Sequence, residues 1–209
     1  MNTVAQAVSI HAKFGASETS FRCGQEIHGQ GEPANYIYEV QRGAVRSYKA
    51  LSGGRRQICA FHLHNDIFGW ETGLSYRFTA EAIVDTTVLV VRRHTLEYVA
   101  ATDVKVTRNL LSLTAKSLEH AESHMLLLGR KNSLEKIVAF LLEMDRRLSC
   151  PSVLALPMTR RDMADYLGLT VETVSRDLSQ LRASGLLRFL ENSQRQIVLQ
   201  DREKLQGLT

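Results

Sequence analysis

Residues 159–187 read TRRDMADYLGLTVETVSRDLSQLRASGLL and predict two short helices joined by a tight turn. Thr159 can cap the first helix, and Asp162, three residues later, can act as the acidic partner of a capping box. Gly168 is expected to end this helix, because glycine readily adopts the left-handed backbone that follows a last turn. Thr170 can then cap the second helix. The stretch therefore predicts a helix-turn-helix.

The second helix, which is expected to end at Gly185, separates apolar from polar residues at about 100° per residue. Its apolar face holds Val171, Val174, Leu178 and Leu181. Its polar face holds Glu172, Ser175, Arg176 and Ser179. If the apolar face packs on the first helix, the polar face is free to enter a DNA major groove, where arginine suits guanine and a carboxylate can accept from cytosine. The alternative is an ordinary helix pair with a solvated charged face.

Composition permits nucleic-acid binding without requiring it, since the 209 residues carry a formal charge of +4 and a pI of about 9.1. The three cysteines are an odd number with no CxxC pair, and we find no apolar secretion signal and no apolar run that could cross a bilayer. We therefore expect a cytoplasmic protein without a membrane partner. Neither a phosphate-binding glycine loop nor a hydrolase or metalloprotease motif occurs, so we do not expect an enzyme.

The N-terminal half predicts a β-structure. Residues 1–18 are small and polar and are expected to form a flexible arm. Residues 19–102 contain short alternating apolar runs separated by turn residues, which favour a sandwich or jelly roll. The clearest runs are 36–40, 44–48, 57–61 and 87–91.

From residue 103 the apolar period becomes helical and predicts a dimerisation helix over 103–129. One stripe has coiled-coil spacing, and its expected interface residues are Leu111, Leu118, Ala121, Met125 and Leu128. A second, more polar stripe runs from Val106 to Leu127. Both stripes could pack within one chain, but reading a palindrome requires two recognition helices, which favours a homodimer.

Gly129 is expected to end this helix, so that residues 130–209 form a second domain. A helix over 133–148 and a short strand over 153–156 precede the helix-turn-helix. After it, residues 186–190 and 196–199 flank a polar turn and predict a β-hairpin wing. The chain is therefore expected to have an α+β fold with a β-roll, a long helix and a winged helix-turn-helix.

The sequence ETVSR at 172–176 resembles the recognition-helix signature of the Crp/Fnr superfamily in its Fnr-like branch. The longer stretch 165–176 is similar to the FixK-type regulators, and residues 29–43 resemble the opening of a cyclic-nucleotide-binding β-roll. The resemblance implies a dimeric transcription activator that binds TTGA-type palindromes, contacts RNA polymerase and serves low-oxygen respiration or nitrogen metabolism.

The resemblance also implies roles for individual residues. Arg176 would read guanine, Glu172 would face cytosine or adenine on the complementary strand, and Ser175 would touch thymine. Residues that would hold phosphates and set the register are Thr159, Arg160, Thr170, Thr173 and Arg182.

The expected ligand residues of a cyclic-nucleotide domain are incomplete. Gly69 is present, but Phe78 and Thr79 replace the Arg-Ser pair that would bind a cyclic phosphate, and Arg77 lies one position away. Three scattered cysteines cannot supply the four thiolates of an iron–sulfur cluster. We therefore expect no cofactor.

Four histidines have the spacing of metal or haem ligands, namely the pairs His62 with His64 and His120 with His124. We expect these to be ordinary polar residues, since no third ligand is near in sequence. Cys150, at a helix end, is a possible redox site, whereas Cys23 and Cys59 are expected in the β-roll.

Two alternatives stay open. One is an effector-gated regulator of the same fold, controlled by a cyclic nucleotide, haem or oxidation. The other is an interaction module whose helix-turn-helix contacts protein instead of DNA.

Overall fold

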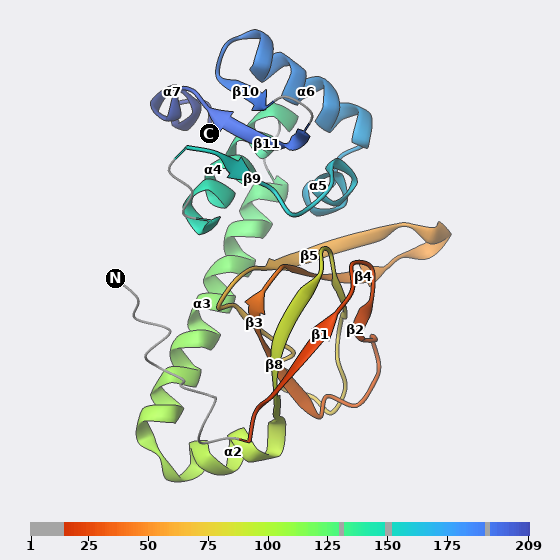
Figure 1. Ribbon diagram of the computed structural model, residues 1–209, viewed down its shortest axis with the longest axis vertical. Helices are drawn as coiled ribbons and strands as arrows, with labels where there is room; N and C mark the ends of the chain where they lie inside the picture. Colours follow the sequence, from red (N-terminus) through yellow and green to blue (C-terminus); the bar gives the residue numbers. More distant parts are fainter. Residues whose placement is uncertain (1–14, 130–131, 149–151, 191–192) are drawn as a thin grey trace. The chain divides into compact units, whose positions relative to one another are not determined.

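The computed structural model describes residues 15–129, 132–148, 152–190 and 193–209. The chain divides into two compact units (Figure 1). The first comprises Met1–Arg55 and Cys59–Glu122, and the second comprises Arg56–Ile58 and Ser123–Thr209. No helix in the described ranges has both the length and the apolar character needed to span a membrane.

The β-structure of the first unit is built on two four-stranded sheets, with the strand orders β1-β8-β3-β6 and β2-β7-β4-β5, and only the first three residues of β5 are grouped with the second unit. The strands are β1 (Ser17–Phe21), β2 (Glu26–His28), β3 (Tyr36–Arg42), β4 (Val45–Ala50), β5 (Arg56–His62), β6 (Ile67–Phe68), β7 (Thr79–Ala82) and β8 (Thr86–Arg92). A single 3-10 turn (Ser52–Gly54) joins β4 to β5. The predicted jelly-roll class and its four clearest strands are confirmed, but β1 begins at Ser17, two residues inside the expected arm.

Alternating side chains give this unit a core between its sheets. Tyr38 and Val40 of β3 point inward and pack with Val45 and Val88 from neighbouring strands. On the opposite face of β3, Ile37 packs against two helices.

The first of these helices, α2 (Arg93–Thr102), was not predicted from the sequence. It begins without a side-chain cap, and Arg92 at the cap position makes no capping hydrogen bond, so the usual start signal is missing. Leu96 is its one buried residue and packs beside Ile37.

The second helix, α3 (Val104–Gly129), ends at the glycine that the sequence indicated. Its two stripes differ in burial. Val106 and Leu127 of the second stripe are buried, whereas Leu111, Leu118 and Met125 of the first stripe are 70%, 59% and 66% exposed. These three residues of the first stripe are therefore largely uncovered within the described part of the protomer.

The second unit surrounds α4 (Ser133–Leu148) with the helix-turn-helix and a small sheet (Figure 1). The remaining elements are β9 (Leu154–Ala155), α5 (Arg160–Leu167), α6 (Val171–Ala183), β10 (Leu187–Leu190), β11 (Ser193–Leu199) and α7 (Arg202–Gln206). Strand β11 lies between β10 and β9, so the predicted wing hairpin belongs to a three-stranded antiparallel sheet. The predicted apolar face of α4 is confirmed, since Ile137, Phe140, Leu141 and Met144 are buried.

We predict that Gly43→Ala will destabilise the first unit. Gly43 has φ = 92°, and an added Cβ would lie 2.5 Å from Thr86 Oγ1 and 2.6 Å from the Asp85 carbonyl oxygen. The backbone conformation alone should cost about 1–2 kcal/mol for alanine, and the steric clash should add about 1–3 kcal/mol. The measurement is urea unfolding.

Gly53→Ala is the matched control. Gly53 has φ = 75°, but no atom of the described residues lies within 4 Å of the place that an added Cβ would take. Gly53→Ala should therefore lower the free energy of unfolding only by the cost of the backbone conformation. Equal destabilisation of the two variants would contradict the clash at Gly43.

Candidate DNA-binding surface

Capping interactions define the first helix of the helix-turn-helix as the sequence predicted. Thr159 Oγ1 accepts a hydrogen bond from the Asp162 backbone N–H at 3.1 Å, and an Asp162 carboxylate oxygen accepts one from the Thr159 backbone N–H at 2.9 Å. Gly168 ends the helix with φ = 64°, in the left-handed region. The first helix is therefore bounded at both ends by local chemistry.

The recognition helix α6 begins at a second threonine cap. Thr170 Oγ1 accepts from the Thr173 backbone N–H at 3.2 Å, and the two hydroxyl oxygens lie 3.1 Å apart. Gly185 follows the helix with φ = 73°. The hydroxyls of Thr170 and Thr173, two of the three threonines assigned to phosphates, thus lie together at the cap, and Thr170 is exposed.

Burial separates the two faces of α6 much as expected. Val174, Leu178 and Leu181 are at most 1% exposed. Val171, which we placed on the same face, is 36% exposed and lies at its edge, so the packed face is narrower than predicted. Glu172 and Arg176 are exposed and Ser175 is half-buried.

The electrostatic state of the exposed face suits base reading. Hydrogen bonds from its own backbone N–H and from the Thr170 hydroxyl lower the pKa of Glu172, so this carboxylate is charged at neutral pH. Arg176 Nε lies 3.3 Å from a carboxylate oxygen of Asp177, while the Arg176 side chain stays 72% exposed. Its guanidinium is therefore oriented by a neighbour but open to a partner.

Asp177 is a functional residue that sequence reasoning missed. Its side chain is buried, and one carboxylate oxygen accepts from the Ser133 hydroxyl at the start of α4. A carboxylate within the apolar arc of an amphipathic helix was the available signal, because Asp177 falls about 60° from Val174 on the helix circumference. The residue joins the recognition helix to α4.

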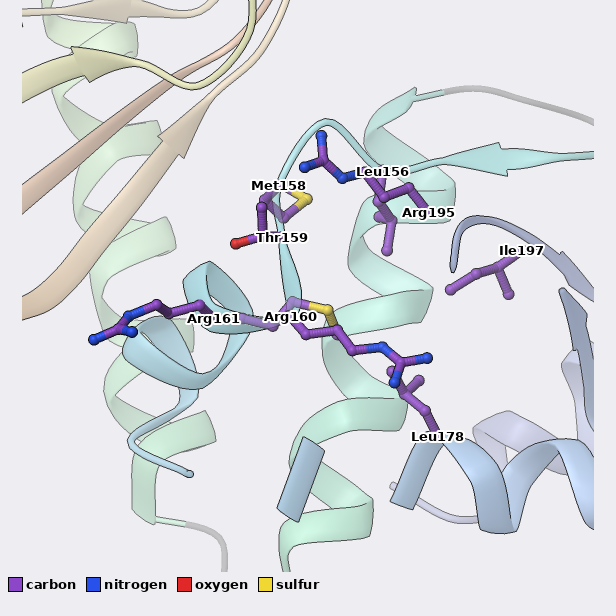
Figure 2. A pocket seen from close by; sticks show the side chains of 9 residues that line it. Leu156, Met158, Thr159, Arg160, Arg161, Leu178, Arg195 and Ile197 are labelled. Carbon is purple, nitrogen blue, oxygen red and sulfur yellow. The ribbon is translucent and has the colours of Figure 1, made fainter. Parts of the chain in front are cut away.

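A pocket of about 290 Å³ lies between the start of α5, helix α6 and strand β11 (Figure 2). Its lining residues are Leu156, Met158, Thr159, Arg160, Arg161, Met163, Leu178, Arg195 and Ile197. Figure 2 shows the Arg160 side chain extending toward Leu178 and Ile197, whereas Arg161 points away from them.

Arg160 touches both the recognition helix and the wing. Its Nη1 donates to Ser175 Oγ at 3.2 Å, and its Cζ lies 5.5 Å from the centroid of the Phe189 ring on β10. Burial, with a smaller effect from the charge of Arg182, lowers the pKa of Arg160. Arg195 on β11, another residue that sequence reasoning missed, donates to the Pro157 carbonyl oxygen at 3.4 Å. Because the charge of Arg182 acts on Arg160, these two predicted phosphate residues lie in one positively charged region.

The histidines of the two pairs have ordinary polar neighbours, and no group of three possible metal ligands occurs in the described part of the chain. His62 Nε2 lies 2.8 Å from Ser47 Oγ, and His64 Nδ1 lies 2.7 Å from the Gln41 carbonyl oxygen. His124 is buried, stacks on the Tyr166 ring at 3.9 Å and contacts its carbonyl oxygen. His124 therefore has a packing role within the second unit.

Of the three cysteines, the structure describes Cys23 and Cys59. Cys150, the predicted redox candidate, lies outside the described residues. Cys23 is exposed, with its thiol 3.2 Å from the Ile83 carbonyl oxygen. Burial raises the pKa of the half-buried Cys59 thiol, which lowers its reactivity at neutral pH.

Comparison with known families matches both halves of the chain. Residues 18–103 match the family described as the cyclic nucleotide-binding domain. Residues 135–208 match the Crp-like helix-turn-helix domain.

Individual relatives agree with these matches. The chain is 40% identical to the nitrogen fixation regulation protein FixK of Rhizobium meliloti over 80% of its own length and 76% of the relative. It is 41% identical to the FixK protein of Azorhizobium caulinodans, over 90% of this chain and 77% of that one. The solved structure of FixK2 from Bradyrhizobium japonicum matches with a TM-score of 0.89 and 58% identity, covering 92% of this chain and 96% of that chain.

The two family matches, the extent of the FixK similarity and the capped helix-turn-helix lead to one assignment. The chain belongs to the Crp/Fnr family of DNA-binding transcription regulators, is FixK-like, and is not an enzyme.

Proposed function

We propose that the protein is a homodimeric transcription activator that binds TTGA-type palindromes and contacts RNA polymerase at promoters for low-oxygen respiration or nitrogen metabolism. The observation that carries the proposal is the exposed face of α6, where Glu172, Ser175 and Arg176 lie beside one another on a doubly capped helix. The relatives named as nitrogen fixation regulation proteins support the choice of target genes.

Each side chain has a partner in this proposal. The Arg176 fork matches the O6 and N7 atoms of guanine, and Glu172 can accept from an amino group of cytosine or adenine on the other strand. Ser175 contacts thymine. Arg160 and Arg182, with the capping threonines 159, 170 and 173, hold the DNA backbone and set the register without reading sequence themselves.

The exposed stripe of α3 supports the dimer. Leu111, Leu118 and Met125 recur every seven residues, and all three are more than half exposed. Ala121 is also exposed, whereas Leu128 is half-buried, with its Cδ2 only 3.6 Å from the position that a Cβ on Gly168 would take. A seven-residue apolar repeat on a long helix is the pattern that pairs helices in coiled coils.

Contacts within the first unit support control without a cyclic nucleotide. Glu71 is buried and accepts from Arg77 Nε at 2.5 Å, so the nearest arginine to the missing Arg-Ser pair already has a carboxylate partner. The His28 ring stacks on Tyr76 at 3.6 Å and lies beside Tyr38, and burial lowers the pKa of His28 to about 4. A neutral, stacked imidazole gives no charge to hold a phosphate at pH 7.

We expect Arg176→Ala to weaken binding to a TTGA palindrome by about 1–3 kcal/mol and to relax the preference at the guanine. Arg182→Ala is the contrasting variant on the same helix. It should weaken all DNA sequences alike and reduce the slope of affinity against salt by about one. Gel-shift titrations over a salt series measure both effects. Unchanged binding in Arg176→Ala would show that another residue reads the guanine.

We expect Leu118→Glu to separate the protomers. Burying an unpaired carboxylate in the seam should cost about 3 kcal/mol or more, which raises the dimer dissociation constant at least about 100-fold. Ser112→Glu is the control, since Ser112 is exposed and lies about 120° around α3 from Leu118. Analytical ultracentrifugation distinguishes the species, and a Leu118→Glu variant that remains dimeric would place the seam elsewhere.

We expect cAMP to change neither the thermal midpoint of the protein nor its affinity for the palindrome. A bound ligand raises stability by RT ln(1 + [L]/Kd), so a ligand at about 100 times its Kd would add about 2.7 kcal/mol. Thermal-shift titration with cAMP tests this. A midpoint that rises with cAMP concentration would support the effector-gated alternative.

A further inference from the structure

The start of α5 presents a cation to the recognition helix in an arrangement that a phosphate contact alone does not explain. Arg160 Nη1 donates to the hydroxyl oxygen of Ser175 at 3.2 Å. Its planar group lies over the Phe189 ring, 5.5 Å from the centroid, on the wing. The guanidinium is thus placed between two elements, with Ser175 at its tip.

The described residues around Arg160 leave its charge largely uncompensated. No carboxylate within salt-bridge distance accompanies it among the described residues, and its Nε is buried with no hydrogen-bond partner there. Arg160 is also the first residue of α5, where the helix dipole disfavours a cation. Partial burial and the nearby positive charge of Arg182 also disfavour the charged form of Arg160 and lower its pKa. Stacking on Phe189 offsets part of this cost.

The hydrogen bond changes what Ser175 can read. A serine hydroxyl can donate one hydrogen bond and accept others, so it suits either kind of base edge when it is free. Here a charged donor occupies the hydroxyl oxygen, and its positive charge disfavours the approach of a second donor such as a base amino group. The hydroxyl proton then points away from the guanidinium and is left to donate.

We propose that Arg160 is a positioning residue that fixes the Ser175 hydroxyl as a donor, so that the pair selects a base edge presenting an acceptor, such as thymine O4 or guanine O6. The inference rests on the proposed function, since it requires α6 to lie in a major groove. Arg160 would then take part in sequence selection, in addition to its proposed contact with the DNA backbone.

The test compares affinities for four palindromes that differ only at the base pair read by Ser175. Ser175→Ala first identifies that position, as the one where the loss of discrimination is largest. The wild-type protein should discriminate there by about 5- to 100-fold, in favour of acceptor edges. Arg160→Lys should reduce this ratio to less than about threefold, because lysine lacks the planar fork of arginine. The slope of log affinity against log salt concentration should stay the same, because lysine retains the charge.

Two further variants complete the design. Arg161→Lys is the matched control, since Arg161 is the next residue and is exposed, and its side chain points away from Leu178 and Ile197 although it also lines the pocket (Figure 2). It should discriminate as the wild type does. The double variant Arg160→Lys with Ser175→Ala should discriminate no worse than Ser175→Ala alone, because residues that act as a unit are not additive.

An Arg160→Lys protein that keeps the wild-type ratio, or a double variant whose losses add, would overturn the inference. Failure of the proposed function is separate and visible in the wild type. A protein that binds the palindrome no better than an unrelated duplex of equal length would refute the function itself. Equal thermal midpoints of the lysine variants and the wild type establish that a changed ratio does not come from unfolding.

Discussion

The buried carboxylate of Asp177 constrains the orientation of the recognition helix. A charge removed from water must be hydrogen-bonded or paired, and Asp177 meets this need through the Ser133 hydroxyl and Arg176 Nε. Turning α6 about its axis would break the Ser133 contact and expose Val174 and Leu178. The rotation that satisfies Asp177 is the one that leaves Ser175 and Arg176, its two preceding neighbours, on the open side.

The same residue links structure to recognition through Arg176. Its carboxylate is shared between an internal hydroxyl and the exposed guanidinium of Arg176, so this arginine has an oriented contact in the absence of DNA. Arg160 supports Ser175 in a similar way, by donating a hydrogen bond to its hydroxyl oxygen. Each of the two side chains proposed to read bases, Arg176 and Ser175, is therefore held by a hydrogen-bonding neighbour, which would lower the entropy cost of ordering it on binding.

Sequence reasoning succeeded where local chemistry determines the structure. Thr159, Asp162, Gly168 and Thr170 bound the two helices through contacts only a few residues apart, and such contacts can be inferred from order alone. Alternating apolar residues likewise identified the main strands of the first unit. Helix α2 lacks a cap signal, and Asp177 makes its decisive contact with a residue 44 positions away, so neither followed from local pattern. The Arg160–Ser175 hydrogen bond depends on how α5 packs on α6, which spacing does not reveal.

The uncovered leucines of α3 have a consequence for the dose response of the protein. If protomers pair through this stripe, active regulator forms by a second-order step, and its amount at low expression rises with the square of the chain concentration. A twofold change in synthesis or degradation would then change promoter occupancy about fourfold in the dilute limit. An apolar helix surface would in this way make promoter occupancy respond steeply to the amount of the protein.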